Sequence, residues 1–264
     1  MEGFDVVKIR DRVYRIWDRE KDSFFLVEGE EKAAVIDTGI TPGAKILPML
    51  RTLTDKPLIL ILTHAHIDHM HHMDEFDTVY LSHEEWKLGQ AILREMMAGK
   101  DLDLAATRDM TTGTVIELGS CPLEICHVPG HTPGSVAVYV PRDKLVFTGD
   151  AIGSGCGVWM QLPGSSSLRE YEKSLRHFMI WLLERGGDMD FWGGHCDQSW
   201  ESRQVPGFNP LSMGLLADLI DLVRKTAAGE IEGEIVEMDP NLRNREARYA
   251  AWGRAEMLYD PDNL

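Results

Sequence analysis

The segment PLILILTHAHIDHMHH, residues 57–72, joins an apolar run directly to a cluster of histidines. Residues 58–62 are apolar without alternation, a pattern typical of a strand that is covered on both faces. Such a strand belongs inside a layered fold, because only layers on both sides remove both faces from water. Five of the ten histidines in the chain lie within residues 64–72, which predicts a concentrated site at the end of this strand.

The first part of this cluster follows the pattern H-x-H-x-D-H, formed by His64, His66, Asp68 and His69. In a helix these positions would fan over more than half of the circumference, but in a loop that leaves a strand they can surround two adjacent cations. Imidazole nitrogens and carboxylate oxygens suit zinc, iron and manganese. A closed structural zinc site is not indicated, because no cysteine thiolate lies nearby in the sequence. The pattern therefore predicts a metal centre.

Two further apolar runs end in a residue of metal-ligand type. LVFTG, residues 145–149, runs into Asp150, and MDFWGG, residues 189–194, runs into His195. Side chains at the ends of neighbouring strands can converge, because a rigid sheet gathers distant parts of the chain into one site. We therefore expect Asp150 and His195 to lie beside the histidine cluster.

Composition and charge narrow the classes of function. With 27 Lys and Arg against 43 Asp and Glu, the net charge of -16 repels nucleic-acid phosphates and anionic membrane surfaces, so neither is an expected partner. The amino terminus lacks the apolar core of a signal peptide, and no stretch approaches the length of a membrane span, which favours a cytoplasmic protein. Four cysteines without a C-x-x-C pair indicate reduced thiols: Cys121, Cys126, Cys156 and Cys196.

The chain shows no repeat and no clear linker, so we expect a single domain over residues 1–264. A helical segment at about 204–248 is a candidate wall of the substrate site. Strands are expected at residues 13–17, 24–28, 33–37, 58–62, 114–118, 123–128, 135–140 and 144–149.

Cap signals place the helices between these strands. The form S-x-x-E occurs at Ser82 and at Ser167, and it predicts helices over about 82–97 and 167–184. A helix-like segment follows Pro42, and another helix is expected over 211–228, where the apolar pattern ends at a glycine.

Further motifs occur in the order expected of a known family. They are VIDTG at 35–39, PGHTPGS at 129–135, FTGDAIGSG at 147–155, GGHCD at 193–197 and a closing strand GRAEMLYDPD at 253–262. With the H-x-H-x-D-H pattern, they resemble the motifs of the metallo-β-lactamase-fold hydrolases over nearly the whole chain, and PGHTPGS and FTGD most resemble the glyoxalase II branch. The resemblance implies an α/β fold of four layers, an αββα sandwich, with a dinuclear metal site at one edge.

The resemblance also implies which side chains bind the metals. One cation would be held by His64, His66 and His131, the other by Asp68, His69 and His195, and both by Asp150 as a bridge. The expected cofactors are two divalent metal ions, with zinc first and iron or manganese as alternatives.

The chemistry follows from two adjacent cations. They lower the pKa of a shared water from near 16 to roughly neutral, so a metal-bound hydroxide is the expected nucleophile. One cation would polarise the substrate carbonyl and stabilise the oxyanion. By the pattern of the family, Asp68 lies near the attacking water, so it is the expected catalytic residue that carries a proton to the leaving group.

Several residues near the motifs admit two interpretations. Asp37 either holds a ligand or the motif loop by hydrogen bonds, or is a turn residue before a glycine. His71 and His72 stand where the family often has glycines, and they either support the site by packing or orient a substrate carboxylate. Trp159 either closes over the substrate or belongs to the core, and Cys156 is either a wall of the site or a metal ligand.

The expected function is hydrolysis of a thioester or ester, with lactones and amides also open, in a small-molecule substrate. The glyoxalase II-like motifs favour thioesters, and the missing signal peptide argues against a secreted β-lactamase. Alternatives are β-lactamase-type amide hydrolysis, an iron-dependent sulfur dioxygenase of the same fold, a nuclease, which the net charge disfavours, and a metal-binding protein without turnover. A homodimer is compatible with the sequence.

Overall fold

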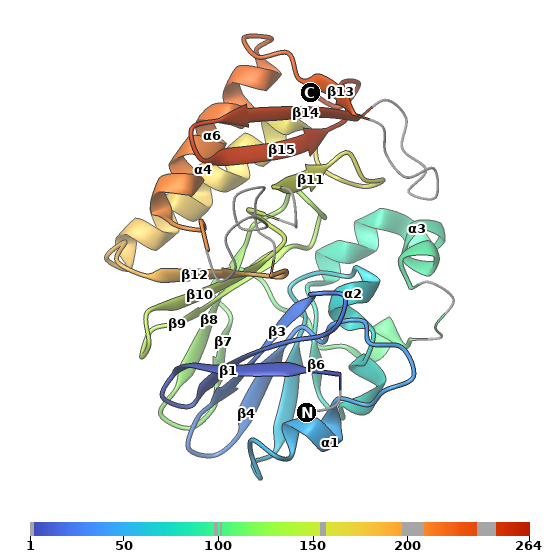
Figure 1. Ribbon diagram of the computed structural model, residues 1–264, viewed down its shortest axis with the longest axis vertical. Coiled ribbons are helices and arrows are strands. Elements are labelled where there is room, and N and C mark those ends of the chain that lie inside the picture. Colours follow the sequence, from blue (N-terminus) through green and yellow to red (C-terminus); the bar gives the residue numbers. More distant parts are fainter. Residues whose placement is uncertain (1–2, 98–99, 101, 154–156, 197–208, 237–246) are drawn as a thin grey trace.

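Two β-sheets stack face to face in the computed structural model, which describes residues 3–97, 100, 102–153, 157–196, 209–236 and 247–264 (Figure 1). In the first sheet, β1 to β4 pair antiparallel, whereas β4, β5 and β6 run parallel. Its six strands follow one another in chain order: β1 (Asp5–Arg10), β2 (Val13–Trp17), β3 (Ser23–Glu28), β4 (Ala33–Ile36), β5 (Leu58–Ile61) and β6 (Val79–Tyr80).

The second sheet contains the strands expected from the middle of the sequence. Within it, β10 pairs antiparallel with β9 and parallel with β12. Its order is β12 (Asp190–Gly193), β10 (Leu145–Gly149), β9 (Val136–Val140), β8 (Pro122–His127) and β7 (Val115–Glu117). The aromatic rings of Phe25 in the first sheet and Phe147 in the second meet at 4.4 Å between centroids, in the core that joins the sheets.

Strand β5 shows why the apolar run before the histidines does not alternate. Ile59 and Ile61 face the core between the two sheets, while Leu60 faces the core on the outer side of the first sheet. Both faces are therefore covered, as the sequence predicts for this strand.

Helices cover the outer face of each sheet. The first sheet is covered by short helices, which are α1 (Leu47–Leu50), α2 (Ile67–Met70), α3 (Gly89–Met96) and the 3-10 turns η1 (Met73–Glu75), η2 (His83–Leu88) and η3 (Leu104–Ala106). The second is covered by α4 (Leu168–Glu184) and α6 (Met213–Ala227), which run side by side in Figure 1. The αββα sandwich expected from the sequence is confirmed.

A small third sheet lies next to α4 and α6 (Figure 1). Its order is β11 (Val158–Met160), β15 (Ala255–Tyr259), β14 (Ala247–Trp252) and β13 (Glu234–Val236). The expected closing strand is thus β15, and α6 packs against α4, β14 and β15. Residues 204–208 and 237–246 lie outside the described residues, so the substrate wall expected at about 204–248 stays a prediction.

The helix expected over residues 82–97 is wrong in form. The chain makes η2, then Gly89 adopts a φ of 75°, and α3 follows. Within the described residues the side chain of Ser82 forms no cap bond, because Glu85 turns inward to Thr132 instead of completing the box. At Ser167 the capping box does form, with Glu170, and the helix runs as expected to Glu184.

The segment after Pro42 also differs from expectation in length, since its helix α1 has only four residues. None of the helices that the structure describes has the length and apolar character that a bilayer crossing requires.

Candidate metal centre

All seven ligands expected from the sequence lie in two adjacent groups at one edge of the stacked sheets. In each group the candidate ligand atoms lie within 4.8 Å of one another. The first, here the tris-His group, consists of His64, His66 and His131, and the second, here the Asp/His group, consists of Asp68, His69, Asp150 and His195.

The segments that carry these side chains leave neighbouring strands. His64 follows β5, Asp150 follows β10 and His195 follows β12, while His131 lies in the connection between β8 and β9. The N–H of Val136 donates to the carbonyl of Thr63 at 2.9 Å and ties the β8–β9 connection to the end of β5.

The H-x-H-x-D-H pattern is divided between a loop and a short helix. His64 lies in the loop and His66 is the N-cap of α2, whereas Asp68 and His69 belong to α2 itself. The loop half contributes to the tris-His group and the helical half to the Asp/His group. The sequence analysis expected a loop throughout, and the helical turn is what separates the two halves.

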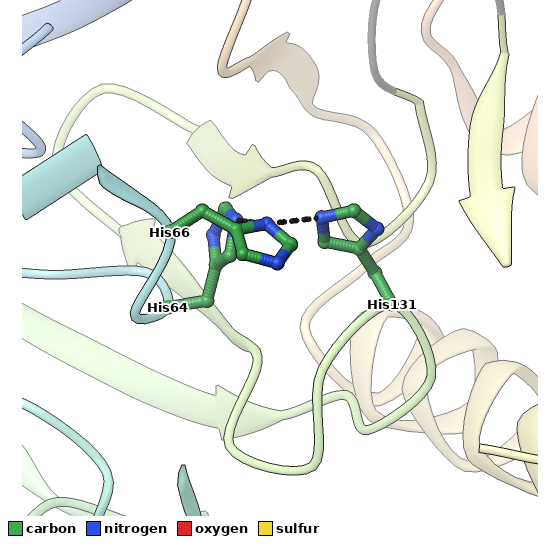
Figure 2. Close-up of side chains that lie close together, drawn as sticks. All are labelled: His64, His66 and His131. Carbon is green, nitrogen blue, oxygen red and sulfur yellow. Dashed lines mark hydrogen bonds between the residues drawn. The ribbon is translucent and has the colours of Figure 1, made fainter. Parts of the chain in front are cut away.

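In the tris-His group three imidazoles point their nitrogens at one place (Figure 2). Nδ1 of His66 lies 2.9 Å from Nε2 of His64 and 2.8 Å from Nε2 of His131. The opposite nitrogen of His131, Nδ1, lies 2.7 Å from the carbonyl oxygen of Trp159. A carbonyl only accepts, so Nδ1 of His131 carries the proton and its Nε2 turns a lone pair toward the group.

The three imidazoles of this group are held neutral. Burial lowers the pKa of His66 to about 3, and the nearby ring of His131 acts in the same direction. Burial also lowers the pKa of His64 and of His131. At pH 7 the group therefore offers neutral nitrogen donors, the form in which histidine binds a metal.

In the Asp/His group carboxylates and imidazoles surround a common centre. Nε2 of His69 lies 3.5 Å from Oδ2 of Asp68 and 3.5 Å from Oδ1 of Asp150. Among the described residues, Nε2 of His69 and Oδ1 of Asp150 are buried and have no hydrogen-bond partner. Buried polar atoms without a partner are costly, and a cation bound between them would satisfy both.

A carboxylate stands behind each imidazole of the Asp/His group. Asp37 Oδ2 lies 2.9 Å from Nδ1 of His69, and Asp22 Oδ1 lies 2.8 Å from Nδ1 of His195. Asp37 also accepts hydrogen bonds from the backbone N–H and the hydroxyl of Thr63, both at 2.8 Å. Its contacts thus favour the first interpretation from the sequence, that Asp37 holds both a ligand and the motif loop.

In the Asp/His group the pKa values of the histidines are raised, whereas those of the tris-His group are lowered. Burial opposes the charged form of His69, but the carboxylates of Asp68 and Asp150 outweigh it and raise the pKa of His69 well above its usual value. The pKa of His195 is raised in the same way, against burial, chiefly by Asp150. A divalent cation would replace the positive charge that protons otherwise supply there.

Asp150 is the member of the Asp/His group whose carboxylate also approaches the tris-His group. Its Oδ2 is 3.3 Å from Nε2 of His195 in the Asp/His group and 3.6 Å from Nε2 of His131 in the tris-His group. Its pKa is lowered well below the usual value, because the imidazoles of His195 and His69 outweigh the effect of burial. The donor set and the partnerless atoms fit the binding of metal ions.

His72, from the same run of histidines, contacts a carboxylate outside the two ligand groups. Nδ1 of His72 lies 2.9 Å from Oε1 of Glu75, whose carboxylate accepts the N–H groups of Ile46 and Leu47 at the start of α1. These contacts favour support by packing over a role at the substrate. The backbone of Trp159 holds His131, while Cys156 lies outside the described residues.

Sequence reasoning missed Asp22 and the carbonyl of Trp159. Asp22 has no local pattern that marks it, because its partner His195 comes from the far end of the second sheet. The carbonyl of Trp159 is a backbone atom, so no residue type signals its contact with His131.

The chain is similar to known proteins over most of its length. The model of the metallo-beta-lactamase superfamily matches residues 19–180. The acyl-coenzyme A thioesterase MBLAC2 of Bos taurus is 27% identical over 218 residues, which cover 70% of this chain and 75% of that protein. The hydroxyacylglutathione hydrolase GloC of Haemophilus influenzae is 27% identical over 225 residues, which cover 80% of this chain and 99% of that protein.

Solved structures agree with the sequence comparisons. A metallo-beta-lactamase from Pontibacter korlensis superimposes with a TM-score of 0.61 at 19% identity, covering 84% of this chain and 99% of that one. The protein TTHA1623 in a di-iron-bound form superimposes with a TM-score of 0.53 at 28% identity, covering 74% of this chain and 92% of that one. The two sheets, the flanking helices and the matched family model together show that the chain belongs to the metallo-beta-lactamase superfamily.

Proposed function

We propose that this metal-dependent hydrolase cleaves small-molecule thioesters with two divalent cations, one in the tris-His group and one in the Asp/His group. The observation that carries the proposal is the position of Asp150, whose carboxylate lies within 3.6 Å of imidazole nitrogens of both groups. Two relatives support the substrate class, since an acyl-coenzyme A thioesterase and a hydroxyacylglutathione hydrolase both act on thioesters. The di-iron form of TTHA1623 supports two cations.

Zinc is the cation that we propose first. Three imidazole nitrogens in the tris-His group match the protein ligands of a common zinc site, in which water or substrate is the further ligand. The carboxylate oxygens of Asp68 and Asp150 make the Asp/His group suitable for iron or manganese as well.

When bound, the two cations would supply a water that is deprotonated near neutral pH and would polarise the thioester carbonyl. The two carboxylates at the centre differ in access: the side chain of Asp68 is 28% exposed and that of Asp150 is 5% exposed. Although burial opposes it, the imidazoles of His69 and His195 lower the pKa of Asp68, so its carboxylate is charged at pH 7. We assign to Asp68 the transfer of a proton from the attacking water to the leaving sulfur, as the acyl–oxygen bond forms and the acyl–sulfur bond breaks.

A panel of substrates tests this proposal. Protein loaded with zinc, manganese or iron is assayed with an acyl-coenzyme A, an acylglutathione, an oxygen ester, a lactone and a β-lactam. We expect the thioesters to be turned over fastest. Turnover of β-lactams alone, or oxygen uptake with a persulfide and iron, would replace the thioester assignment, and no turnover of any substrate would contradict it.

A pair of histidine variants links turnover to the metal centre. His66→Ala removes a nitrogen of the tris-His group and should lower the metal content by about one equivalent. It should lower kcat/KM by more than roughly a hundredfold, above the loss caused by removing a group that merely orients a ligand. His83→Ala is the matched control, because its ring stacks on Trp86 at 3.8 Å, outside both ligand groups. The control should keep both cations and the activity.

A further inference from the structure

Glu85 is a fully buried carboxylate that lies behind the tris-His group. It belongs to η2, has no exposed surface, and accepts a hydrogen bond from the hydroxyl of Thr132. Thr132 follows the ligand His131 directly in the chain. One oxygen of the carboxylate therefore holds the segment that carries the third imidazole of the group.

The same carboxylate meets the segment that carries the other two imidazoles. The backbone N–H of Ala65, between His64 and His66, approaches the carboxylate, as does the N–H of Gly134. Both N–H groups favour the charged form of Glu85. Its second oxygen is buried and, among the described residues, forms no hydrogen bond of ordinary geometry.

The β8–β9 connection is packed directly on Glu85. A Cβ atom added to Gly134 would lie 2.5 Å from Cγ of Glu85 and 2.7 Å from its backbone nitrogen, distances at which atoms collide. The hydroxyls of Thr132 and Ser135 lie 2.8 Å apart. Since Thr132 donates its proton to Glu85, Ser135 donates to Thr132, and the segment 132–135 has a defined direction of hydrogen bonding.

Burying a charged carboxylate at this position lowers the stability of the folded protein. Burial raises the pKa of Glu85 to about 7, and the hydroxyl of Thr132 and the two N–H groups only partly offset that effect. An apolar side chain would avoid the cost of burying a charge, but it could not join the two segments by hydrogen bonds.

We propose that Glu85 is a positioning residue of the metal centre, which holds the segment 63–66 against the segment 131–135 and so sets the spacing of the three imidazoles. The inference rests on the proposed function only in that the tris-His group binds a cation. Loss of a side chain that orients metal ligands typically lowers metal affinity by about 10–100-fold. Glu85 acts one step further from the metal, through the backbone, so we expect about tenfold.

The test measures cation binding without any substrate. Zinc affinity is determined by chelator competition in the wild type, Glu85→Gln and Glu85→Ala, and cobalt absorption spectra report the ligand environment. We expect Glu85→Ala to bind the cation of the tris-His group about tenfold more weakly and to shift its cobalt spectrum toward that of His66→Ala. Glu85→Gln keeps an acceptor for Thr132, so its loss should be smaller.

Ser82→Ala is the matched control within the same turn. The Ser82 hydroxyl is also buried, but it has no hydrogen-bond partner among the described residues. Its removal should leave both affinities and the cobalt spectrum unchanged. A role of Glu85 in folding alone would lower the melting temperature and leave the cation affinity of the folded protein as in the wild type.

A second variant tests the link from the other end. Thr132→Val removes the hydroxyl that donates to Glu85 and keeps the shape of the side chain. If both residues act through one contact, Glu85→Gln should lower affinity less in the Thr132→Val background than in the wild type. If Glu85→Ala does not fold, this comparison still tests whether Glu85 influences cation affinity through Thr132.

Three results would overturn the inference: wild-type affinity in folded Glu85→Ala and Glu85→Gln, equal weakening at both ligand groups, or a wild type that binds no cation. A wild type that binds two cations but hydrolyses no thioester would contradict the proposed function and leave the role of Glu85 intact.

Discussion

The two ligand groups differ in the chemistry of their atoms and in what stands behind them. The tris-His group presents three imidazoles whose pKa values are lowered, whereas the Asp/His group presents two imidazoles whose pKa values are raised. A neutral set of nitrogens thus lies beside a charged set of nitrogens and oxygens, although four of these residues come from one short stretch, 64–69.

The two groups differ in the partner of the ring nitrogen that faces away from the ligand group, which is Nδ1 in His64, His131, His69 and His195. A hydroxyl of Thr63 stands behind His64 at 3.1 Å, and a carbonyl stands behind His131. Carboxylates of Asp37 and Asp22 stand behind the two imidazoles of the other group. A carboxylate makes an imidazole a more basic ligand than a carbonyl does, so the two cations should differ in affinity and in sensitivity to mutation.

The largest loss of metal binding and activity is expected when Asp150 is removed, because its carboxylate lies near the imidazoles of both groups. Asp150→Ala deletes the carboxylate that lies within reach of His131, His69 and His195. It should weaken binding of both cations and lower kcat/KM by roughly a thousandfold or more, beyond the 10–100-fold typical of a group that only orients a ligand. Metal analysis and steady-state kinetics measure the two effects.

A matched control exists for this change. Asp188→Ala removes an exposed carboxylate that pairs with Lys144 at 3.1 Å on the surface. It should change neither metal content nor kcat/KM. Retention of one full equivalent of metal in Asp150→Ala would show that the carboxylate serves only one group.

The next largest effect is a change in the pH dependence of stability when the buried carboxylate of Glu85 is replaced. The pKa of Glu85 rises from 4.5 to about 7, so between these values the folded protein holds a proton that the unfolded chain has lost. The stability that this proton provides is complete below about pH 4.5 and is lost as pH rises through 7. Glu85→Gln removes this dependence. Relative to the wild type, the metal-free variant should therefore gain up to about 3 kcal/mol between pH 5 and 8.

Urea unfolding of the metal-free proteins at several pH values measures this gain. Ser82→Ala changes no titrating group in the same turn, so its difference from the wild type should stay constant with pH. A constant difference for Glu85→Gln as well would mean that the carboxyl titrates as in the unfolded chain.

The convergence of the candidate ligands could be predicted from the sequence, because these residues follow apolar strands in short motifs. His64, Asp150 and His195 each lie within three residues of the end of a strand, and the fold then brings these strand ends together. Local pattern and tertiary structure agree at these positions.

The residues behind the ligands could not be predicted in the same way. Asp22 meets His195 from the opposite end of the chain, and Glu85 looked like half of a capping box. In the structure Glu85 turns to Thr132, because a tertiary contact in a buried place outweighs a local bond at a helix start. The sequence motif likewise does not show that its first half forms a loop and its second half a helical turn, because this division depends on tertiary packing.

A smaller effect separates the two groups directly. Asp22→Asn keeps the size of the side chain but removes the charge behind His195. It should weaken the cation of the Asp/His group by about 10–100-fold and leave the tris-His group within about twofold, measured by chelator competition. Equal losses at both groups in Asp22→Asn would contradict the assignment.

The smallest effect on metal binding is expected at His72, which belongs to the same run of histidines as the ligands. Its Nδ1 contacts Glu75, and Glu75 holds the start of α1, so the contact supports the fold of the first sheet. His72→Ala should lower the free energy of unfolding by about 1–3 kcal/mol, as for a buried hydrogen bond to a charged group. Cation affinity should stay within about twofold, because neither ligand group loses an atom. A tenfold loss in the folded variant would instead join His72 to the metal centre, and the division of the run into ligands and support would fail at that residue.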